Sequence, residues 1–179
     1  MRTCRAATAG KLTVVLATLV LLAGCGDGPS PRAWAASVCS ALTPWRAEIS
    51  KLTRSTDEQM TAQTTPAQAK ENLVRMFAGA EQASETARRS IEQAGVPETE
   101  HGEEISVGFR DSLAKIRDAY GRARDTIDGL GTGQATAFYD GVRTAVDTLK
   151  AEYDASALDT SRLNSEELKR AFDEVPECR

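Results

Sequence analysis

One histidine and the glutamates beside it form the clearest cluster of side chains able to do chemistry. His101 lies within PETEHGEE, residues 97–104, with glutamates at positions 98, 100, 103 and 104. Zinc sites usually recruit several His or Cys ligands from separated segments, and this chain has no second histidine. Acids also gather at helix N-termini, where the helix dipole favours negative charge. We therefore interpret the segment as a helix start and predict no metal site and no cofactor.

The remaining motifs do not assemble a catalytic set. GLGTG, residues 129–133, lacks the preceding strand and the following lysine of a phosphate-binding loop, so we interpret it as a turn between helices. Neither GxSxG nor HExxH occurs in the sequence. The paired acids at 103/104 and 166/167 are interpreted as helix starts. We predict no catalytic residue, and an enzyme with a site made only of acids is the third hypothesis.

The first 24 residues have the pattern of a secretory signal. Three basic residues and no acid occur in residues 1–11, and LTVVLATLVLL, residues 12–22, follows them. Eleven helical residues span about 16 Å, well short of the ~30 Å hydrocarbon core, so this run does not predict a mature transmembrane helix. Small residues then lead directly to Cys25.

Leu22-Ala23-Gly24-Cys25 resembles the lipobox of bacterial lipoproteins. The resemblance implies cleavage before Cys25 and lipid attachment to its sulfur, which would anchor an exported protein to the outer face of the cell membrane. We expect a signal peptide in 1–24, the anchor and a short linker in 25–31, and a helical domain in 32–179. The excess of arginine (16) over lysine (6) and the segment WAASVCSALTPW, residues 34–45, are similar to small exported actinobacterial lipoproteins, most of which lack an assigned activity.

The predicted signal and anchor account for two of the four cysteines and change the net charge of the mature chain. Cys4 leaves with the signal and Cys25 carries the lipid, so Cys39 and Cys178 remain, and such a pair in an exported protein predicts a disulfide. No CxxC spacing or nearby histidine indicates a reactive thiol. Removing residues 1–24 changes the net charge from −4 to −7. We therefore expect membrane attachment through the lipid and no binding to nucleic acid.

Apolar residues recur every three or four positions through most of the mature chain, which predicts an all-α fold. Thr43-Pro44 divides the first stripe, 35–52, into two short helices or one bent helix. A loop is expected over 53–65, and a capping box with Pro66 at the first helical position starts the next helix. Further helices are predicted over 66–94, 105–130 and 138–153, with a last one capped by Asn164. These elements predict a four-helix up-and-down bundle with a short extra C-terminal helix.

The function hypotheses rest on this bundle and its anchor. The first is a non-enzymatic, membrane-anchored envelope lipoprotein that acts as a protein-interaction or structural module, with a protein or another envelope component as its partner. The second is a bundle that holds a small molecule or lipid against Phe77, Phe109 and Tyr120. Trp45 continues the apolar stripe and is expected in the core, whereas Trp34 lies nearest the anchor and is a candidate for contact with the membrane interface.

Overall fold

The computed structural model describes residues 28–156 and 163–178, and every regular element within them is helical. Four long helices come first, followed by a short helix and a final 3-10 turn. They are α1 (Pro31–Gln59), α2 (Pro66–Ala94), α3 (Gly102–Asp128), α4 (Ala135–Ala155), α5 (Glu166–Glu174) and η2 (Pro176–Cys178). The all-α prediction is therefore confirmed for the described residues.

Local sequence signals account for several helix boundaries. Thr65 and Gln68 form the predicted capping box, in which the Gln68 backbone N–H donates to Thr65 Oγ1 and the Gln68 side chain accepts from the Thr65 N–H. Gly95, with φ of 75°, ends α2 in the left-handed region that glycine tolerates. For α5 the predicted cap was wrong by one residue, because the side chain that accepts from the backbone of Leu168 belongs to Ser165, not Asn164.

Helix α1 runs without interruption from Pro31 to Gln59 and contains Pro44. Of the two alternatives for residues 35–52, the single helix is the one found, and the predicted loop over 53–65 was wrong in its first half. The extra turns are polar, but Thr56 is buried and Gln59 accepts a hydrogen bond from Arg75 of α2 at 3.4 Å. Packing against α2 thus extends the helix beyond its apolar stripe.

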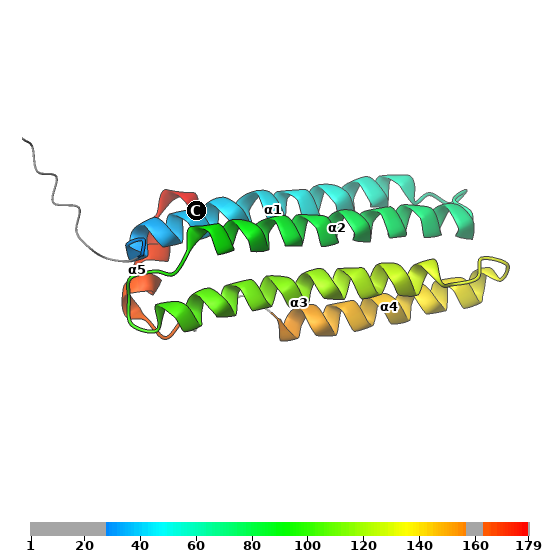
Figure 1. Cartoon of the computed structure of the whole chain (residues 1–179). Coiled ribbons are helices and arrows are strands. Elements are labelled where there is room, and N and C mark those ends of the chain that lie inside the picture. Colours follow the sequence, from blue (N-terminus) through cyan, green and yellow to red (C-terminus); the bar gives the residue numbers. More distant parts are fainter. Residues whose placement is uncertain (1–27, 157–162, 179) are drawn as a thin grey trace, which may run out of the picture.

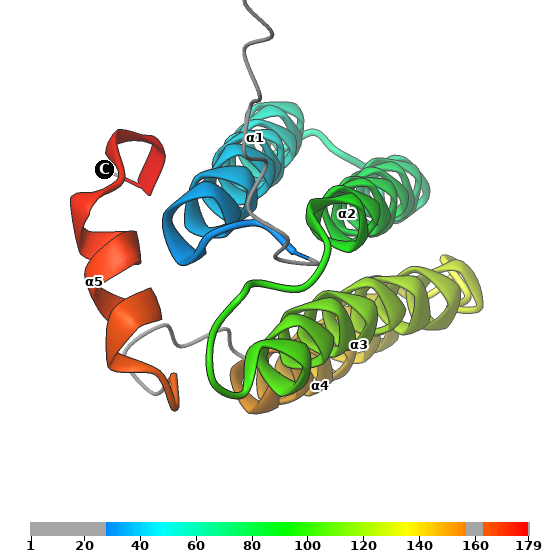
Figure 2. The same ribbon diagram turned by 60° about the vertical axis from the view of Figure 1, so that its left-hand side comes forward.

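Consecutive long helices lie side by side and run in opposite directions (Figure 1). α2 packs against both α1 and α3, α4 packs mainly on α3, and α5 with η2 covers the beginning of α1. Figure 2 shows α5 crossing the end of the molecule where α1 begins. Among the described elements α1 and α4 are not backbone neighbours, so α2 and α3 are the central pair.

Aromatic rings close the core at the α5 end. Trp34 meets Phe109 and Phe172 edge-on, with ring centroids 5.3 and 6.0 Å apart, and Phe109 stacks on Phe172. Trp34 is completely buried, so its predicted contact with the membrane interface was wrong. Phe172 of α5 packs against the indole ring. Trp45 lies in the core as expected.

Candidate binding groove between α1 and α2

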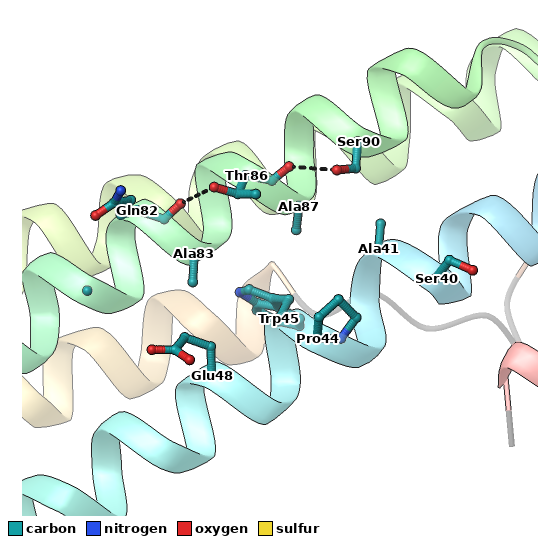
Figure 3. A pocket seen from close by; sticks show the side chains of 11 residues that line it. Ser40, Ala41, Pro44, Trp45, Glu48, Gln82, Ala83, Thr86, Ala87 and Ser90 are labelled. Atoms are coloured by element: carbon teal, nitrogen blue, oxygen red, sulfur yellow. Dashed lines mark hydrogen bonds between the residues drawn. The ribbon is translucent and has the colours of Figure 1, made fainter.

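An open groove of about 490 Å³ runs between the middle of α1 and the second half of α2 (Figure 3). Small apolar side chains and Trp45 form its floor, and hydroxyl, amide and carboxylate groups line its edges. The lining residues are Ser40, Ala41, Pro44, Trp45 and Glu48 of α1, and Gly79, Gln82, Ala83, Thr86, Ala87 and Ser90 of α2. The alanines leave the space that larger side chains would fill, whereas the position beside Gly79 is taken by Leu52 of α1.

Pro44 gives the α1 side of the groove an unusual backbone. Proline has no N–H, so the carbonyl oxygen of Ser40 cannot receive the hydrogen bond that residue i+4 normally donates in a helix. Ser40 and Pro44 both line the groove. A helix interior usually offers a ligand no free backbone acceptor, and here one carbonyl is left without its usual donor.

The hydroxyl groups on the α2 side have already used their protons. Thr86 Oγ1 donates to the carbonyl of Gln82 at 3.0 Å, and Ser90 Oγ donates to the carbonyl of Thr86 at 3.1 Å (Figure 3). Their oxygens therefore face the groove mainly as acceptors. Glu48 adds a carboxylate, which an exposed pair with Lys51 at 3.2 Å engages only weakly. The edges of the groove favour a ligand that donates hydrogen bonds.

The floor of the groove is held in place by a buried hydrogen-bond chain. Trp45 Nε1 donates to Ser84 Oγ at 3.0 Å, and Ser84 Oγ donates to the carbonyl of Ala80 at 2.8 Å. Ser84 is fully buried, so this chain satisfies polar groups that would otherwise be unpaired. The indole orientation is consequently fixed before any ligand arrives.

The three residues predicted to line a ligand cavity are all buried, but the structure divides them between two ring clusters. The ring centroids of Phe77 and Tyr120 lie 6.3 Å apart, whereas Phe109 belongs to the cluster with Trp34 and Phe172. Burial raises the pKa of Tyr120 to about 12, with the neighbouring Tyr153 adding to the shift. None of the three lines the α1–α2 groove. Their ligand-lining role stays a prediction.

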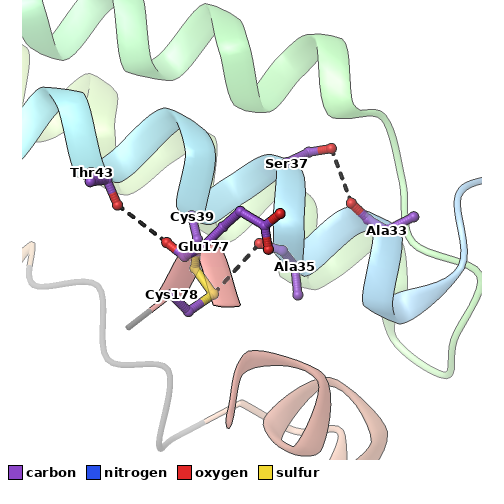
Figure 4. Close-up of a disulfide and its surroundings, with 7 residues drawn as sticks. All are labelled: Ala33, Ala35, Ser37, Cys39, Thr43, Glu177 and Cys178. Atoms are coloured by element: carbon purple, nitrogen blue, oxygen red, sulfur yellow. Dashed lines mark hydrogen bonds between the residues drawn. A yellow bond between two sulfur atoms is a disulfide. The ribbon is translucent and has the colours of Figure 1, made fainter. Parts of the chain in front are cut away.

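Cys39 and Cys178 form the predicted disulfide (Figure 4), with Cα atoms 5.0 Å apart. The bridge joins the first third of α1 to the last turn of the chain. Cys178 Sγ also lies 3.8 Å from the carbonyl of Ala35, and Thr43 Oγ1 donates to the carbonyl of Glu177 at 3.4 Å. The C-terminal turn is therefore fixed along α1, and the disulfide prediction is confirmed.

Tightly held residues also occur just after the predicted anchor. Cys25 itself lies outside the described residues, which begin at Gly28. The backbone N–H of Glu98 donates to the carbonyl of Pro29 at 2.9 Å, so the linker is bound to the connection between α2 and α3. Ser30 then caps α1 by accepting from Ala33 at 3.3 Å. No helix in the part of the chain described here is long and apolar enough to cross a membrane.

His101 is exposed and precedes α3 in the left-handed region, with φ of 59°. Its ring nitrogens lie 3.6 and 3.5 Å from carboxylate oxygens of Glu100 and Glu104. Glu103 and Glu104 occupy the first turn of α3, as the interpretation of this segment as a helix start predicted. Within the described residues no three His, Cys, Asp or Glu side chains are arranged to hold a metal ion.

Ion pairs tie the central helices α2 and α3 together. Glu85 of α2 receives hydrogen bonds from Arg88 and Arg89 of its own helix and from Arg117 of α3 at 2.7 Å. These hydrogen bonds, led by that of Arg88, hold the pKa of the Glu85 carboxyl far below its usual range. Glu81 pairs with Arg124 in the same way one turn earlier on α2. This network links α2 to α3 and lies outside the groove.

Comparison with known proteins gives no match, whether against protein-family models, curated protein sequences or solved structures. The groove is also the feature that sequence reasoning missed. Its signals were Pro44 inside a helical stripe and alanines at 83 and 87, one turn apart on α2. Those signals did not show which faces of α1 and α2 meet.

Proposed function

We propose that this chain is a lipid-anchored, non-enzymatic binding module on the outer face of the cell membrane. Residues 1–24 are the signal, 25–31 carry the lipid and linker, and 32–179 form the binding domain. The preformed α1–α2 groove carries the proposal. Glu48 is the ionisable side chain in its lining, and the other polar side chains there carry hydroxyls and an amide. Such a lining suits recognition better than proton transfer.

For the domain we propose a four-helix up-and-down bundle with α5 as an additional C-terminal helix. The antiparallel order of α1 to α4 supports this assignment. Ring contacts across the interior support it too, since Trp34 of α1 reaches Phe109 of α3, and Tyr120 of α3 meets Tyr153 of α4.

The proposed occupant of the groove is a lysine- or arginine-bearing segment of an envelope protein. A long basic side chain has an aliphatic stem, which fits the alanine floor, and a charged head, which suits the acceptors. Glu48 and the Thr86 hydroxyl oxygen supply acceptors, and we propose the Ser40 carbonyl, which lacks its usual helical donor, as a third. Trp45, of which 7% remains exposed, adds an apolar ring against which the aliphatic stem can pack.

Titration of the anchor-free chain, residues 25–179 with Cys25→Ala, tests the groove. The probe is a short peptide alternating leucine and lysine, and the matched control peptide has glutamate in place of lysine. We expect the lysine peptide to shift the NMR signal of the Trp45 indole N–H, and the glutamate peptide to leave it unchanged. Equal shifts with both peptides, or none, would refute the proposed ligand class.

Paired variants locate the binding. Ala83→Phe fills the groove, and Ala151→Phe places the same ring on the exposed face of α4. Binding of the lysine peptide should be lost in Ala83→Phe and retained in Ala151→Phe. If Ala83→Phe binds normally, the peptide occupies another surface.

The anchor has its own test. Intact mass of the protein extracted from its membrane should show a chain that begins at Cys25 and carries acyl groups. Cys25→Ala should be left unprocessed or released from the membrane. Unchanged membrane retention of Cys25→Ala would contradict the lipid anchor.

A further inference from the structure

The chain enters the folded domain at a fixed point. A Cβ atom on Gly28 would lie 2.3 Å from the carbonyl oxygen of Val96, so only glycine allows the backbone this close to the α2–α3 connection. One residue later, the Pro29 carbonyl accepts the hydrogen bond from Glu98. The linker is therefore held against the α2–α3 connection from its first described residue.

That connection is itself rigidly attached to the core. The carbonyl of Gly95 accepts hydrogen bonds from Trp34 Nε1 of α1 and from Ser106 Oγ of α3, each at 3.0 Å. Trp34 and Ser106 are both buried. Two side chains from different helices thus fix the corner on which Gly28 rests, and the entry point cannot move independently of the bundle.

The distance to the anchor is short. Cys25 precedes Gly28 by three residues, which span at most about 11 Å when fully extended. We infer that the end of the bundle formed by residues 28–31 and 95–101, the anchor end, faces the lipid bilayer. The α1–α2 and α3–α4 connections then form the end that points away from the membrane. This inference rests on the proposed lipidation of Cys25.

The helix lengths determine how far the molecule extends from the membrane. The helices α1, α2 and α3 run between the two ends, whereas the shorter α4 stops before the anchor end (Figure 1). The 29 residues of α1 span roughly 43 Å. The groove begins at Ser40 and ends near Glu48 on α1, which places it about 15 to 27 Å from the Ser30 cap. The partner segment would bind within that layer, beside the molecule rather than above it.

The anchor end carries side chains of both charges, so we assign the attachment to the acyl chains. Val96 is 41% exposed and offers an apolar side chain beside the tether. Four glutamates between positions 98 and 104 carry negative charge nearby, and the exposed Arg32 and Arg170 carry positive charge at the same end. A bundle lying on its long side would need an attraction between that side and the headgroups, and the acidic mature chain supplies none through its net charge.

Site-specific fluorescence in vesicles tests the orientation. Single Val96→Cys, Glu98→Cys and Ala62→Cys variants of the acylated, disulfide-bonded protein are labelled with nitrobenzoxadiazole and bound to phosphatidylcholine vesicles containing a lipid with a nitroxide headgroup. All three positions are exposed, and Ala62 lies in the α1–α2 connection. We expect several-fold stronger quenching of the probes at 96 and 98 than of the probe at 62.

The outcomes separate this inference from the anchor on which it rests. Acylated, vesicle-bound protein whose probe at Ala62 is quenched as strongly as that at Val96 overturns the orientation and leaves the anchor intact. Acylated, bound protein with no quenching at Val96 or Glu98 also overturns it. A chain without acyl mass that fails to float with the vesicles refutes the anchor, and the orientation with it.

Discussion

Cutting the Cys39–Cys178 bridge should strongly destabilise the protein without changing its fold. The two cysteines are separated by 139 positions, and a loop of about that length restricts the unfolded chain by roughly 5 kcal/mol in the chain-entropy description. For a domain of this size that corresponds to a fall in Tm of about 10–20 °C. The effect comes mainly from the unfolded state, so helix content should be unchanged below the transition.

The native packing of the C-terminal segment supports that expectation. Leu168, Phe172 and Val175 are buried and belong to the same core as Trp34, so α5 has apolar contacts of its own that do not depend on the disulfide. The far-ultraviolet circular dichroism of the reduced protein at low temperature should therefore match that of the oxidised protein. Hydrogen exchange in α5 should become faster, because its link to α1 is gone.

Thermal and urea unfolding of the oxidised protein, the reduced protein and Cys39→Ala/Cys178→Ala provide the measurement. The reduced protein keeps both sulfur atoms and isolates the effect of the crosslink. The double variant adds the loss of packing at Cys39, which is 8% exposed. Equal midpoints for the oxidised and reduced proteins would show that the bridge does not restrict the unfolded chain as argued.

Four further substitutions, one of them a matched control, test other contacts. Ser84→Ala leaves the buried indole N–H of Trp45 without its acceptor and should lower the free energy of unfolding by about 1–3 kcal/mol, measured in urea. Gly102→Ala would place a Cβ atom 2.1 Å from a backbone carbonyl oxygen and should cost about 1–3 kcal/mol, whereas Gly108→Ala, with nothing within 4 Å, should stabilise by up to about 1 kcal/mol. Glu85→Gln should destabilise at pH 7. The folded-state pKa of the Glu85 carboxyl lies below the ordinary value of 4.5. The carboxylate therefore contributes its full stabilisation above pH 4.5, and this contribution is lost as the pH falls toward the folded-state pKa. The free energies of unfolding of Glu85→Gln and the parent should become equal in acid.

Each of these expectations has a contradicting result. Unchanged stability of Ser84→Ala would mean that the indole finds water or another acceptor. Equal effects of Gly102→Ala and Gly108→Ala would show that the corner relaxes easily. A stability difference between Glu85→Gln and the parent that does not depend on pH would remove the carboxylate as its cause.

Sequence predicted the elements whose signals are local. The capping box at Thr65 and the terminal Gly95 define α2 within a few residues of chain, so its limits could be derived before the structure. The disulfide followed from compartment and cysteine number rather than from geometry. Neither the limits of α2 nor the disulfide required knowledge of which helices pack together.

Features that depend on packing between distant segments could not be derived in that way. The last turns of α1 are polar, and contacts such as that of Leu52 against Gly79 of α2 are visible only in the fold. Trp34 looked available to a membrane because α5, more than 130 residues later, is what covers it. The groove was missed for the same reason, since its floor belongs to two helices whose relative rotation the periodicity leaves open.

Trp45 connects the core to the proposed binding surface. Its ring fills the core, its N–H is satisfied by Ser84, and its remaining exposed edge lies in the groove. A ligand there meets a surface whose largest side chain is already ordered, so binding need not be offset by the entropy of fixing it. Trp34 similarly fixes the corner that receives Gly28 and Pro29, so both this corner and the groove are held by a buried indole. With the proposed lipid anchor, the height of the groove above the bilayer would follow from the fold, and the proposed partner would have to present its basic segment at that height.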